Sequence, residues 1–362
     1  MFTPADSAHM ARALQLAARG RYTAHPNPMV GCVLVNGGDI VGEGFHERAG
    51  GPHAEIVALE AARDRSQGAT AYVSLEPCAH HGRTPPCTTA LIDAGVGKVV
   101  AAMRDPFDEV AGRGLEVLED AGVETAVGLM QGAAERLNAG FVSRVMRGRP
   151  FVRLKIAASI DGATAMASGE SRWITSPEAR RDVHTLRAGS GAILTGIGTV
   201  LADDPSLTVR DVETHGLQPL RVVLDSRLRM PAAAAMLGLP GDTLVCCTAG
   251  QEASALREAG AEVQEFGAHG DVVNVFEVLA ALGEREVNDA LVEAGPRLAG
   301  YLLDKDLIDE LVIYQSPHIM GSNTRGMFAT PAWEALADRR TLELTDVRRV
   351  GPDTRITATL TG

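Results

Sequence analysis

The residues that decide the first half of this chain read Gly-Pro-His-Ala-Glu at positions 51–55, Leu-Glu-Pro-Cys at 75–78 and Thr-Pro-Pro-Cys at 84–87. Histidine and cysteine are ligands that Zn²⁺ prefers, and three protein ligands leave one coordination position open, as in catalytic zinc sites. A zinc ion held in this way makes a bound water nucleophilic near neutral pH. Glu55 remains to carry protons between that water and a leaving group. The stretch therefore predicts a hydrolytic zinc centre.

The order of these residues is that of the zinc nucleobase deaminases, in which His-x-Glu precedes Pro-Cys. An alanine-rich helix is expected at 54–62 and a strand at 69–75. His53 and Glu55 would point in different directions from the middle of a helix, because each residue turns by about 100°. Both can face one metal only from the first helical turn. Gly50-Gly51-Pro52 indicates that the helix begins there.

The spacing leaves the third metal ligand open. The signature usually ends in Cys-x-x-Cys, but His81 occupies the position of the second cysteine, and the next cysteine is Cys87. We favour Cys87, because it opens an apolar helix expected at 88–94, where the helix dipole stabilises a thiolate. The predicted ligands are thus His53, Cys78 and Cys87, with Cys78 and His81 as the alternative closure.

Composition limits the class of the protein. The length of 362 residues predicts two domains, and 45% hydrophobic with 22% charged residues is typical of a soluble globular protein. A net charge of −12 argues against non-specific binding to nucleic acid, so we expect a small-molecule substrate. No apolar run approaches the roughly 20 residues of a membrane span, and no signal-peptide pattern is present. Five cysteines suit the cytoplasm.

The first half predicts an α/β domain that ends in an arginine-rich connector at 141–150. His25-Pro26-Asn27-Pro28 predicts a turn, in which Asn27 either holds the edge of a substrate base or is an ordinary turn residue. The expected helices are 7–19 and 112–121, and the expected strands are 31–35, 40–45, 98–102 and 123–127.

The second half predicts another α/β domain, with strands at 151–156, 192–195, 221–227, 244–247 and 291–297. A helix is expected from Ser176, as N-cap, and Pro177, and a further helix at 298–303. Gly196-Ile197-Gly198 follows a strand and permits close backbone approach to a phosphate, although it lacks the third glycine of a Rossmann fingerprint. Strands that lead through glycine-rich turns into helices favour a nucleotide site.

The motifs of both halves resemble one family over nearly the whole chain. The sequence resembles the bifunctional riboflavin-biosynthesis deaminase–reductases of bacteria. In the first half, the resemblance lies in the zinc stretch and in the proline-rich turn at residues 25–28. In the second half, it lies in residues 165–171, 173–177, 199–205 and 292–296. It implies a cytidine-deaminase-like α/β/α domain at 1–147 and a dihydrofolate-reductase-like α/β domain at 148–362.

The resemblance also implies two consecutive reactions. The first removes the 2-amino group of 2,5-diamino-6-ribosylamino-4-pyrimidinone 5′-phosphate with zinc held by His53, Cys78 and Cys87 and with Glu55 as proton carrier. The second reduces the ribosyl group to ribityl with NADPH. The implied substrate contacts of the reductase are Ser171, Arg187, Asp203, Leu207, Arg210 and Glu293. The implied cofactor contacts are Ala157, Trp173, Thr199, Ser226, Gly295, Pro296, Arg297, Leu298, Ala299, Gly300 and Tyr301.

Physical chemistry favours some of these roles. Arg187 and Arg210 have the guanidinium geometry to clamp a sugar phosphate in bidentate fashion, and Trp173 offers a stacking face. Ser226-Arg227 suits the 2′-phosphate of NADPH, whereas Asp225 weakens this argument because an acidic residue would favour the free 2′-hydroxyl of NADH.

Two other functions remain open from the sequence. One is a monofunctional deaminase whose second domain binds only a nucleotide. The other is a structural zinc module, closed by His80 or His81 as a fourth ligand, with a regulatory ligand-binding domain. The sequence leaves the oligomeric state open, a homo-oligomer included.

Overall fold

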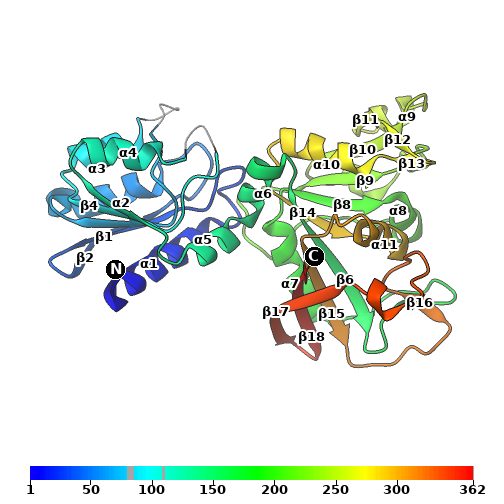
Figure 1. Cartoon of the computed structure of the whole chain (residues 1–362). Coiled ribbons are helices and arrows are strands. Elements are labelled where there is room, and N and C mark those ends of the chain that lie inside the picture. Colours follow the sequence, from blue (N-terminus) through cyan, green and yellow to red (C-terminus); the bar gives the residue numbers. More distant parts are fainter. Residues whose placement is uncertain (80–84, 108–110, 362) are drawn as a thin grey trace. The chain divides into compact units, whose positions relative to one another are not determined.

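The structure of the protein is a computed structural model, which describes residues 1–79, 85–107 and 111–361 (Figure 1). The chain divides into two compact units, Met1–Gly148 and Arg149–Gly362. Each unit has its own sheet, with helices on both faces, as expected for two α/β domains.

The first unit is built on a five-stranded sheet of order β2-β1-β3-β4-β5. β1 pairs in antiparallel fashion with both β2 and β3, whereas β3, β4 and β5 run parallel. A tight turn at residues 37–38 joins β1 to β2 in a hairpin. The strands are β1 (Gly31–Asn36), β2 (Asp39–Phe45), β3 (Thr70–Val73), β4 (Lys98–Ala101) and β5 (Glu124–Val127).

Alternate residues of the strands point to opposite faces of this sheet and meet different helices. Cys32 and Leu34 pack with α2, α3 and α4, whereas Val33 and Val35 pack with α1 and α5. The two helices that begin beside the predicted zinc site, α2 and α3, therefore share one face. The helices are α1 (Pro4–Ala17), α2 (Ala54–Ala62), α3 (Cys87–Asp93), α4 (Arg113–Asp120), α5 (Gln131–Leu137) and α6 (Ala139–Arg147).

The second unit contains a nine-stranded sheet of order β11-β10-β9-β8-β14-β6-β15-β18-β17. The strands from β11 to β15 in this order run parallel, and β18 and β17 continue the sheet in antiparallel fashion. The strands are β6 (Phe151–Ser159), β8 (Ala192–Gly196), β9 (Leu220–Leu224), β10 (Thr243–Thr248), β11 (Glu262–Phe266), β14 (Asp289–Glu293), β15 (Glu310–Ser316), β17 (Thr341–Val350) and β18 (Asp353–Thr361). Two further sheets have two antiparallel strands each. One pairs β7 (Ala163–Met166) with the distant β16 (Thr324–Gly326), and the other is the hairpin of β12 (Ala268–His269) and β13 (Val272–Val273).

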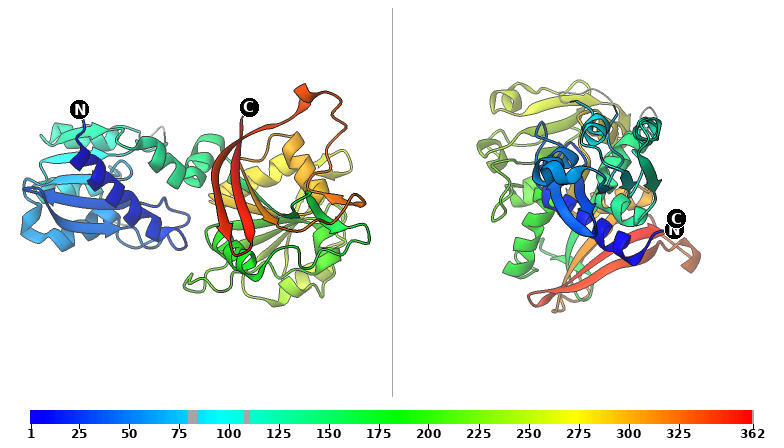
Figure 2. Two further views of the ribbon diagram at one scale, coloured as in Figure 1. Left: turned by 90° about the horizontal axis from the view of Figure 1, so that it is seen from below. Right: turned by 90° about the vertical axis from the view of Figure 1, so that its left-hand side faces the viewer.

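Helices cover both faces of this larger sheet (Figure 2). α10 and α11 pack in the core with β6, while α7 packs with β14 and β15, and α8 and α9 pack with β8, β9 and β10. Because the carboxyl ends of parallel strands meet at one edge, the residues that follow β8, β9, β14 and β6 gather there. The helices are α7 (Pro177–Ala188), α8 (Ile197–Asp203), α9 (Ser254–Glu258), α10 (Val275–Glu284) and α11 (Pro296–Asp304).

The structure differs from the sequence prediction in the bounds of some elements and contains others that were not predicted. α1 begins at Pro4 rather than at residue 7, because Thr3 and Asp6 form a capping box that the prediction overlooked. α11 begins at Pro296 rather than at residue 298, with Pro296 in the first helical turn, which suits the fixed φ of proline. The long β17–β18 hairpin was not predicted at all. By contrast, Ser176 caps α7 as predicted, its side chain accepting the backbone N–H of Ala179.

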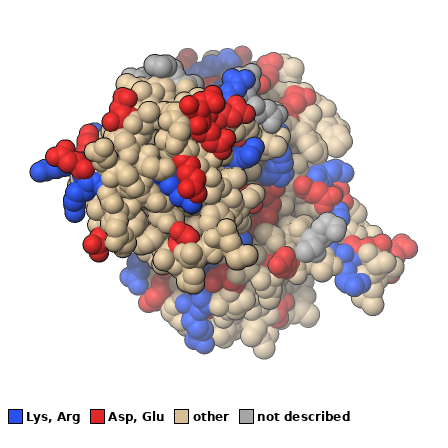
Figure 3. Space-filling view, turned by 60° about the vertical axis from the view of Figure 1, so that its left-hand side comes forward, with Lys and Arg blue, Asp and Glu red and all other residues tan. Residues whose placement is uncertain are grey.

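Charge is dispersed on the face of the molecule shown in Figure 3. Lys and Arg side chains lie among Asp and Glu, and uncharged residues cover most of that face. In the part of the chain that the structure describes, the helices lack the combination of length and apolar character that a bilayer span requires.

Candidate functional site

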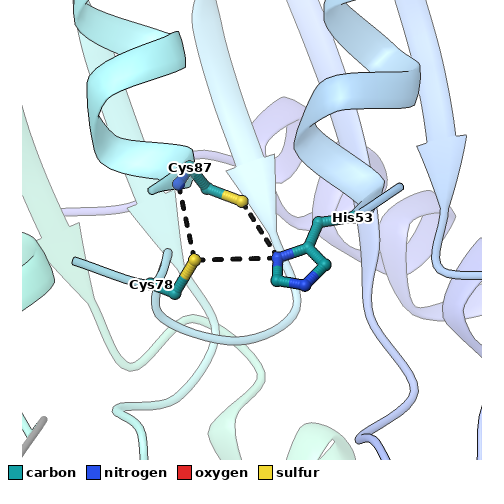
Figure 4. Close-up of side chains that lie close together, drawn as sticks. All are labelled: His53, Cys78 and Cys87. Atoms are coloured by element: carbon teal, nitrogen blue, oxygen red, sulfur yellow. Dashed lines mark hydrogen bonds between the residues drawn. The ribbon is translucent and has the colours of Figure 1, made fainter. Parts of the chain in front are cut away.

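His53, Cys78 and Cys87 lie together in the first unit, with their ligand atoms all within 4.8 Å of one another. Nδ1 of His53 is 3.2 Å from Sγ of Cys87 and 3.6 Å from Sγ of Cys78. Figure 4 shows the three side chains pointing toward one another, His53 and Cys87 from the starts of two helices and Cys78 from a loop. These are the three predicted ligands, among which Cys87 was favoured because it opens a helix. His80 and His81, the alternative ligands, lie outside the described residues.

Helix starts place the imidazole and one thiol. His53 is the N-cap of α2 and has extended backbone angles, so its side chain leaves the helix in a direction that a helical residue cannot reach. Glu55 follows within the first turn of α2, as predicted. Cys87 is the first residue of α3, so the prediction that it opens a helix is confirmed.

Local hydrogen bonds favour the thiolate form of Cys78. The Cys87 thiol, the His53 ring and the backbone N–H of Cys87 all hydrogen-bond to its sulfur and, against the opposing effect of burial, lower the pKa of Cys78 to about 4. The thiolate is the form that binds metal. A nitrogen and two sulfurs at this spacing fit a zinc ion, and no fourth protein ligand joins them among the described residues.

Glu55 lies buried beside these residues, with 3% of its surface exposed. Burial raises the pKa of Glu55 to about 7, because the charged form loses hydration. Its Oε2 has no hydrogen-bond partner among the described residues. A buried carboxyl oxygen without a partner is costly in a folded protein, which indicates that it serves a ligand.

Sequence reasoning missed His46, which completes this site. The side-chain amide of Asn27 donates to Nε2 of His46 at 3.0 Å, so Nδ1 carries the proton and donates to the carbonyl of Pro52 at 3.0 Å. The His46 ring lies edge-on to His53 at 5.4 Å. The turn signal of 25–28 pointed to Asn27, but no local pattern marks His46, which β2 brings to the site from its end.

In the second unit, Arg187 of α7 and Glu293 at the end of β14 form a buried ion pair. Nε and Nη2 of Arg187 lie 2.6 and 3.0 Å from the two carboxylate oxygens of Glu293, and each side chain is 13% exposed. The remaining guanidinium nitrogen donates to the carbonyl of Thr208 at 3.0 Å. All three nitrogens are engaged, so Arg187 holds Glu293, and the expectation of a bidentate phosphate clamp at Arg187 is not supported by this geometry.

Lys155 of β6 is a further charged residue that the sequence did not single out. Its ammonium group lies 4.0 Å from Glu293, and its side chain is 17% exposed. Burial lowers the pKa of Lys155, while Glu293 opposes this shift. For Glu293, burial alone would raise the pKa, but Arg187 and then Lys155 outweigh it and lower the pKa to about 2. The sequence did not mark Lys155 as a site residue, because nothing in the pattern of strand β6 distinguishes it from an ordinary strand residue.

The expected substrate residues fall into two groups, one connected to Arg187 and one connected to Arg172. Thr208 joins the segment 207–210 to Arg187, and the backbone N–H of Arg210 donates to Nδ1 of His184 at 3.1 Å. Asp203, at the end of α8, pairs instead with Arg172 at 3.6 Å. Leu207 is only 3% exposed and packs in the core, so it offers almost no surface to a substrate.

The loop before α7 presents Trp173 with 70% of its surface exposed. The guanidinium groups of Arg180 and Arg172 lie 4.5 and 5.8 Å from the centre of the indole. Ser171 lies in the same loop and is half-buried. An exposed indole held by two cations provides a stacking face, as the sequence suggested.

The expected cofactor residues follow the carboxyl ends of the parallel strands. Ala157 lies near the end of β6, Thr199 in α8 and Ser226 after β9, and all three are half-buried. In the run 295–301, a ligand can reach Gly295, Pro296, Arg297, Leu298 and Tyr301. Ala299 and Gly300 are buried, and a Cβ on Gly300 would lie 2.2 Å from the carbonyl of Ala329, so these two residues pack α11 rather than contact a cofactor.

Asp225 does not face a ligand. Its side chain is fully buried, and Oδ2 accepts the backbone N–H of Met230 at 2.7 Å. Oδ2 of Asp225 thus helps to hold the loop after β9, while Oδ1 has no hydrogen-bond partner among the described residues. Arg227 in the same loop is exposed.

The chain matches two known families. Residues 3–103 match the cytidine and deoxycytidylate deaminase zinc-binding region. Residues 150–356, more than half of the chain, match the RibD C-terminal domain. The chain belongs to the RibD family. The expected fold class, a cytidine-deaminase-like unit followed by a RibD reductase unit, is thereby confirmed.

Relatives of the RibD family cover the chain from end to end. The riboflavin biosynthesis protein RibD of Escherichia coli is 51% identical over 96% of this chain and 97% of its own length. Acinetobacter baumannii RibD is 43% identical with a TM-score of 0.92, over 99% of both chains. A diaminohydroxyphosphoribosylaminopyrimidine deaminase/5-amino-6-(5-phosphoribosylamino)uracil reductase from Thermotoga maritima is 32% identical with a TM-score of 0.87, over 99% of both chains. The family is that of bifunctional riboflavin-biosynthesis enzymes, and the monofunctional alternative is not supported.

Glu293 makes the stability of the second unit depend on pH. Its pKa is lower in the folded than in the unfolded chain, so the ion pair contributes stability that is lost as the pH falls from about 4.5 to about 2. We expect the free energy of unfolding of the wild type to fall by about 2–3 kcal/mol more than that of Glu293→Gln over this range. Denaturant titrations at several pH values measure the difference. Glu284→Gln, on the exposed part of α10, is the control, and equal pH profiles for wild type and Glu293→Gln would contradict the expectation.

Proposed function

We propose that this chain catalyses two successive steps of riboflavin biosynthesis: deamination of 2,5-diamino-6-ribosylamino-4-pyrimidinone 5′-phosphate in the first unit, and NADPH-dependent reduction of the ribosyl group to ribityl in the second. The observation that carries the proposal is the His53, Cys78 and Cys87 cluster with the buried Glu55 beside it. The proposed substrate is the one named for the Thermotoga maritima relative. Small-molecule chemistry also agrees with the net charge of −12.

Zinc suits the donor set of the first unit, and His53, Cys78 and Cys87 would hold it. When bound, zinc supplies the Lewis acidity that makes a water molecule a nucleophile at neutral pH. Glu55 takes a proton from the attacking water and gives it to the departing amine. The pKa near 7 suits both parts of this task, because the carboxyl group accepts and releases a proton at similar cost.

His46 and Asn27 orient the pocket around this proton transfer. The hydrogen bonds of His46 to Asn27 and Pro52 hold its ring in one tautomer. Pro52 directly precedes His53, so this contact also steadies the entry into α2. We propose that Asn27 contacts the edge of the pyrimidine, which leaves its amino group facing Glu55.

In the second unit, the edge formed by the carboxyl ends of β8, β14 and β6 would hold NADPH, which supplies the hydride. No atom lies within 4 Å of a Cβ placed on Gly198 or Gly295, so among the described residues a ligand can approach the backbone there. Gly295 caps α11, whose first N–H groups are free of helical hydrogen bonds and suit a phosphate. Glu293, fixed by Arg187, ends its strand beside this helix and would hold the sugar that is reduced.

We also propose a cytoplasmic location. All the cysteines of the chain are free thiols, including those outside the metal cluster, Cys32, Cys246 and Cys247. Buried unpaired thiols are typical of a reducing compartment. A homo-oligomer remains a prediction to be measured.

The zinc ligands can be tested by metal content. We expect the wild type to retain about one zinc per chain and Cys87→Ser to lose both zinc and deamination, because two ligands hold the ion weakly. His81→Ala should keep zinc and activity. A Cys87→Ser protein that retains zinc, together with a His81→Ala protein that loses it, would contradict this ligand set and favour the alternative closure.

The two reactions should be separable, because the two sites share no residue. We expect Glu55→Gln to lower deamination by at least about 100-fold, the range for loss of a general acid–base. Reduction of supplied deaminated substrate should stay near the wild-type rate. Asp203→Ala or Glu293→Ala should do the converse and release deaminated intermediate without consuming NADPH. Mass spectrometry with and without NADPH reads both steps, and thermal melts control for folding. Loss of both activities in a well-folded Glu55→Gln protein would overturn the two-site proposal.

Arg227 should favour NADPH over NADH. A guanidinium beside the 2′-phosphate binds NADPH alone, so we expect Arg227→Ala to raise the KM for NADPH about 10-fold and to leave that for NADH unchanged. Arg229→Ala, an exposed arginine in the same loop, is the matched control. An unchanged NADPH-to-NADH preference in Arg227→Ala would remove this residue from the cofactor site.

A further inference from the structure

Glu76 is a buried carboxylate that lies two residues before Cys78, and the chemistry of the site has not used it. It is 4% exposed. Buried carboxylates are rare unless they are paired or fully hydrogen-bonded, because their hydration is lost. Glu76 has no cation as a partner in the interactions that the structure describes. Its hydrogen bonds must therefore compensate for the hydration that the buried carboxylate loses.

Four backbone N–H groups donate to this one side chain. Oε2 accepts from Asp105 at 3.2 Å and from Gly112 at 3.0 Å. Oε1 accepts from Gly114 at 2.9 Å and from Leu115 at 3.4 Å. Gly112 is the N-cap of α4, and Gly114 and Leu115 belong to its first turn, whose N–H groups have no partner within the helix. A carboxylate from another segment of the chain thus caps α4, with a favourable helix dipole.

Gly114 meets the same segment at the backbone. A Cβ on Gly114 would lie 2.1 Å from the carbonyl oxygen of Pro77 and 3.1 Å from Oε1 of Glu76. No other residue fits there unless the Pro77 backbone moves. The peptide between Glu76 and Cys78 therefore rests directly on the first turn of α4.

α3 holds Cys78 from its other side. The backbone N–H and the hydroxyl of Thr88 both lie 3.3 Å from the carbonyl oxygen of Cys78. The backbone N–H of Cys87 lies 3.4 Å from Sγ of Cys78. The segment 76–78 is thus fastened to α4 through Glu76 and to α3 through Thr88, and α3 also presents Cys87.

We propose that Glu76, with Gly114 opposite it, is a positioning residue of the deaminase site: it fixes the backbone that presents the Cys78 thiol to His53 and Cys87. The inference rests on the proposed zinc-dependent deamination. Glu76 acts through Cys78 and touches neither metal nor substrate. Partners that orient metal ligands from outside the ligand set commonly change metal affinity or activity by about 10- to 100-fold when they are removed.

Glu76→Gln isolates this role, because glutamine keeps the shape of the side chain. Each carboxylate oxygen accepts two backbone N–H groups. In glutamine one oxygen is replaced by an NH₂ group, which is itself a donor and cannot accept these two N–H groups. The segment 76–78 must then shift away from α4. Glu116→Gln, an exposed carboxylate in the first turn of the same helix, is the matched control for the loss of one charge.

The measurement is the zinc affinity of the full-length chain in competition with a chelator, with kcat and KM for deamination and the rate of reduction recorded on the same samples. We expect Glu76→Gln to bind zinc about 10- to 100-fold more weakly and to lower kcat for deamination with little change in KM. Reduction should stay at the wild-type rate. Glu116→Gln should match the wild type throughout.

Gly114→Ala tests the same contact from the other side with Glu76 intact, and should weaken zinc binding in the same way. Gly132→Ala in α5 is its control, because the nearest atom there is the end of the flexible Arg136 side chain at 3.4 Å. If Glu76→Gln does not fold, Glu76→Asp takes its place, since the shorter side chain keeps the charge but cannot reach all four donors. Its zinc affinity should then fall as well.

Thermal melts separate positioning from simple stability. Folded variants at Glu76 and Gly114 that melt at lower temperature but keep wild-type zinc affinity and kcat would overturn the role of Glu76 and leave the proposed function intact. A wild-type chain without affinity for zinc would instead overturn the proposed function, and the role of Glu76 with it.

Discussion

The first turn of α2 is the constraint on which the deaminase site depends. A histidine and a glutamate two residues apart can serve one centre only if one of them is outside the regular helix, and His53 is outside as the N-cap. Cys87 likewise lies at a helix start, because it is the first residue of α3. Regular helical backbone angles begin at these two places, so the directions of the His53 and Cys87 side chains are set there. Both predicted ligands are thus positioned by helix starts.

The sheet of the second unit imposes a comparable constraint by different means. Parallel strands end at one edge, so polar residues that follow separate strands meet there. Burial of Glu293 at that edge would be unfavourable for a lone carboxylate, and Arg187 and Lys155 offset the lost hydration. Much of the attraction within this buried ion pair is offset by the hydration that its charges lose. Its value is that the carboxylate is held in one orientation beside the open backbone of Gly295.

The position of Cys78 depends on residues that take no part in the chemistry themselves. In the described residues around it, 74–79, Cys78 lies in neither a helix nor a strand. Backbone donors of α4 meet Glu76 on one side, and Thr88 of α3 meets the carbonyl of Cys78 on the other. Two helices that are separate in the sequence thereby set the place of one thiol. Glycine at position 114 is part of this arrangement, since its Cα lies against the Pro77 carbonyl.

The sequence by itself determined what local chemistry decides: the α/β class, most strands, the cap of α7 at Ser176 and the residues of the zinc stretch, because periodicity, capping and ligand type act over a few residues. Only the tertiary structure decided what distant segments bring together. His46 reaches the deaminase site through β2, Lys155 meets Glu293 across neighbouring strands, and Asp225 turns inward to hold Met230. Ala299 and Leu207 proved to be core residues for the same reason. Whether a residue is buried, and which residues it contacts, depends on how the whole chain packs. Residue type and spacing alone do not specify either property.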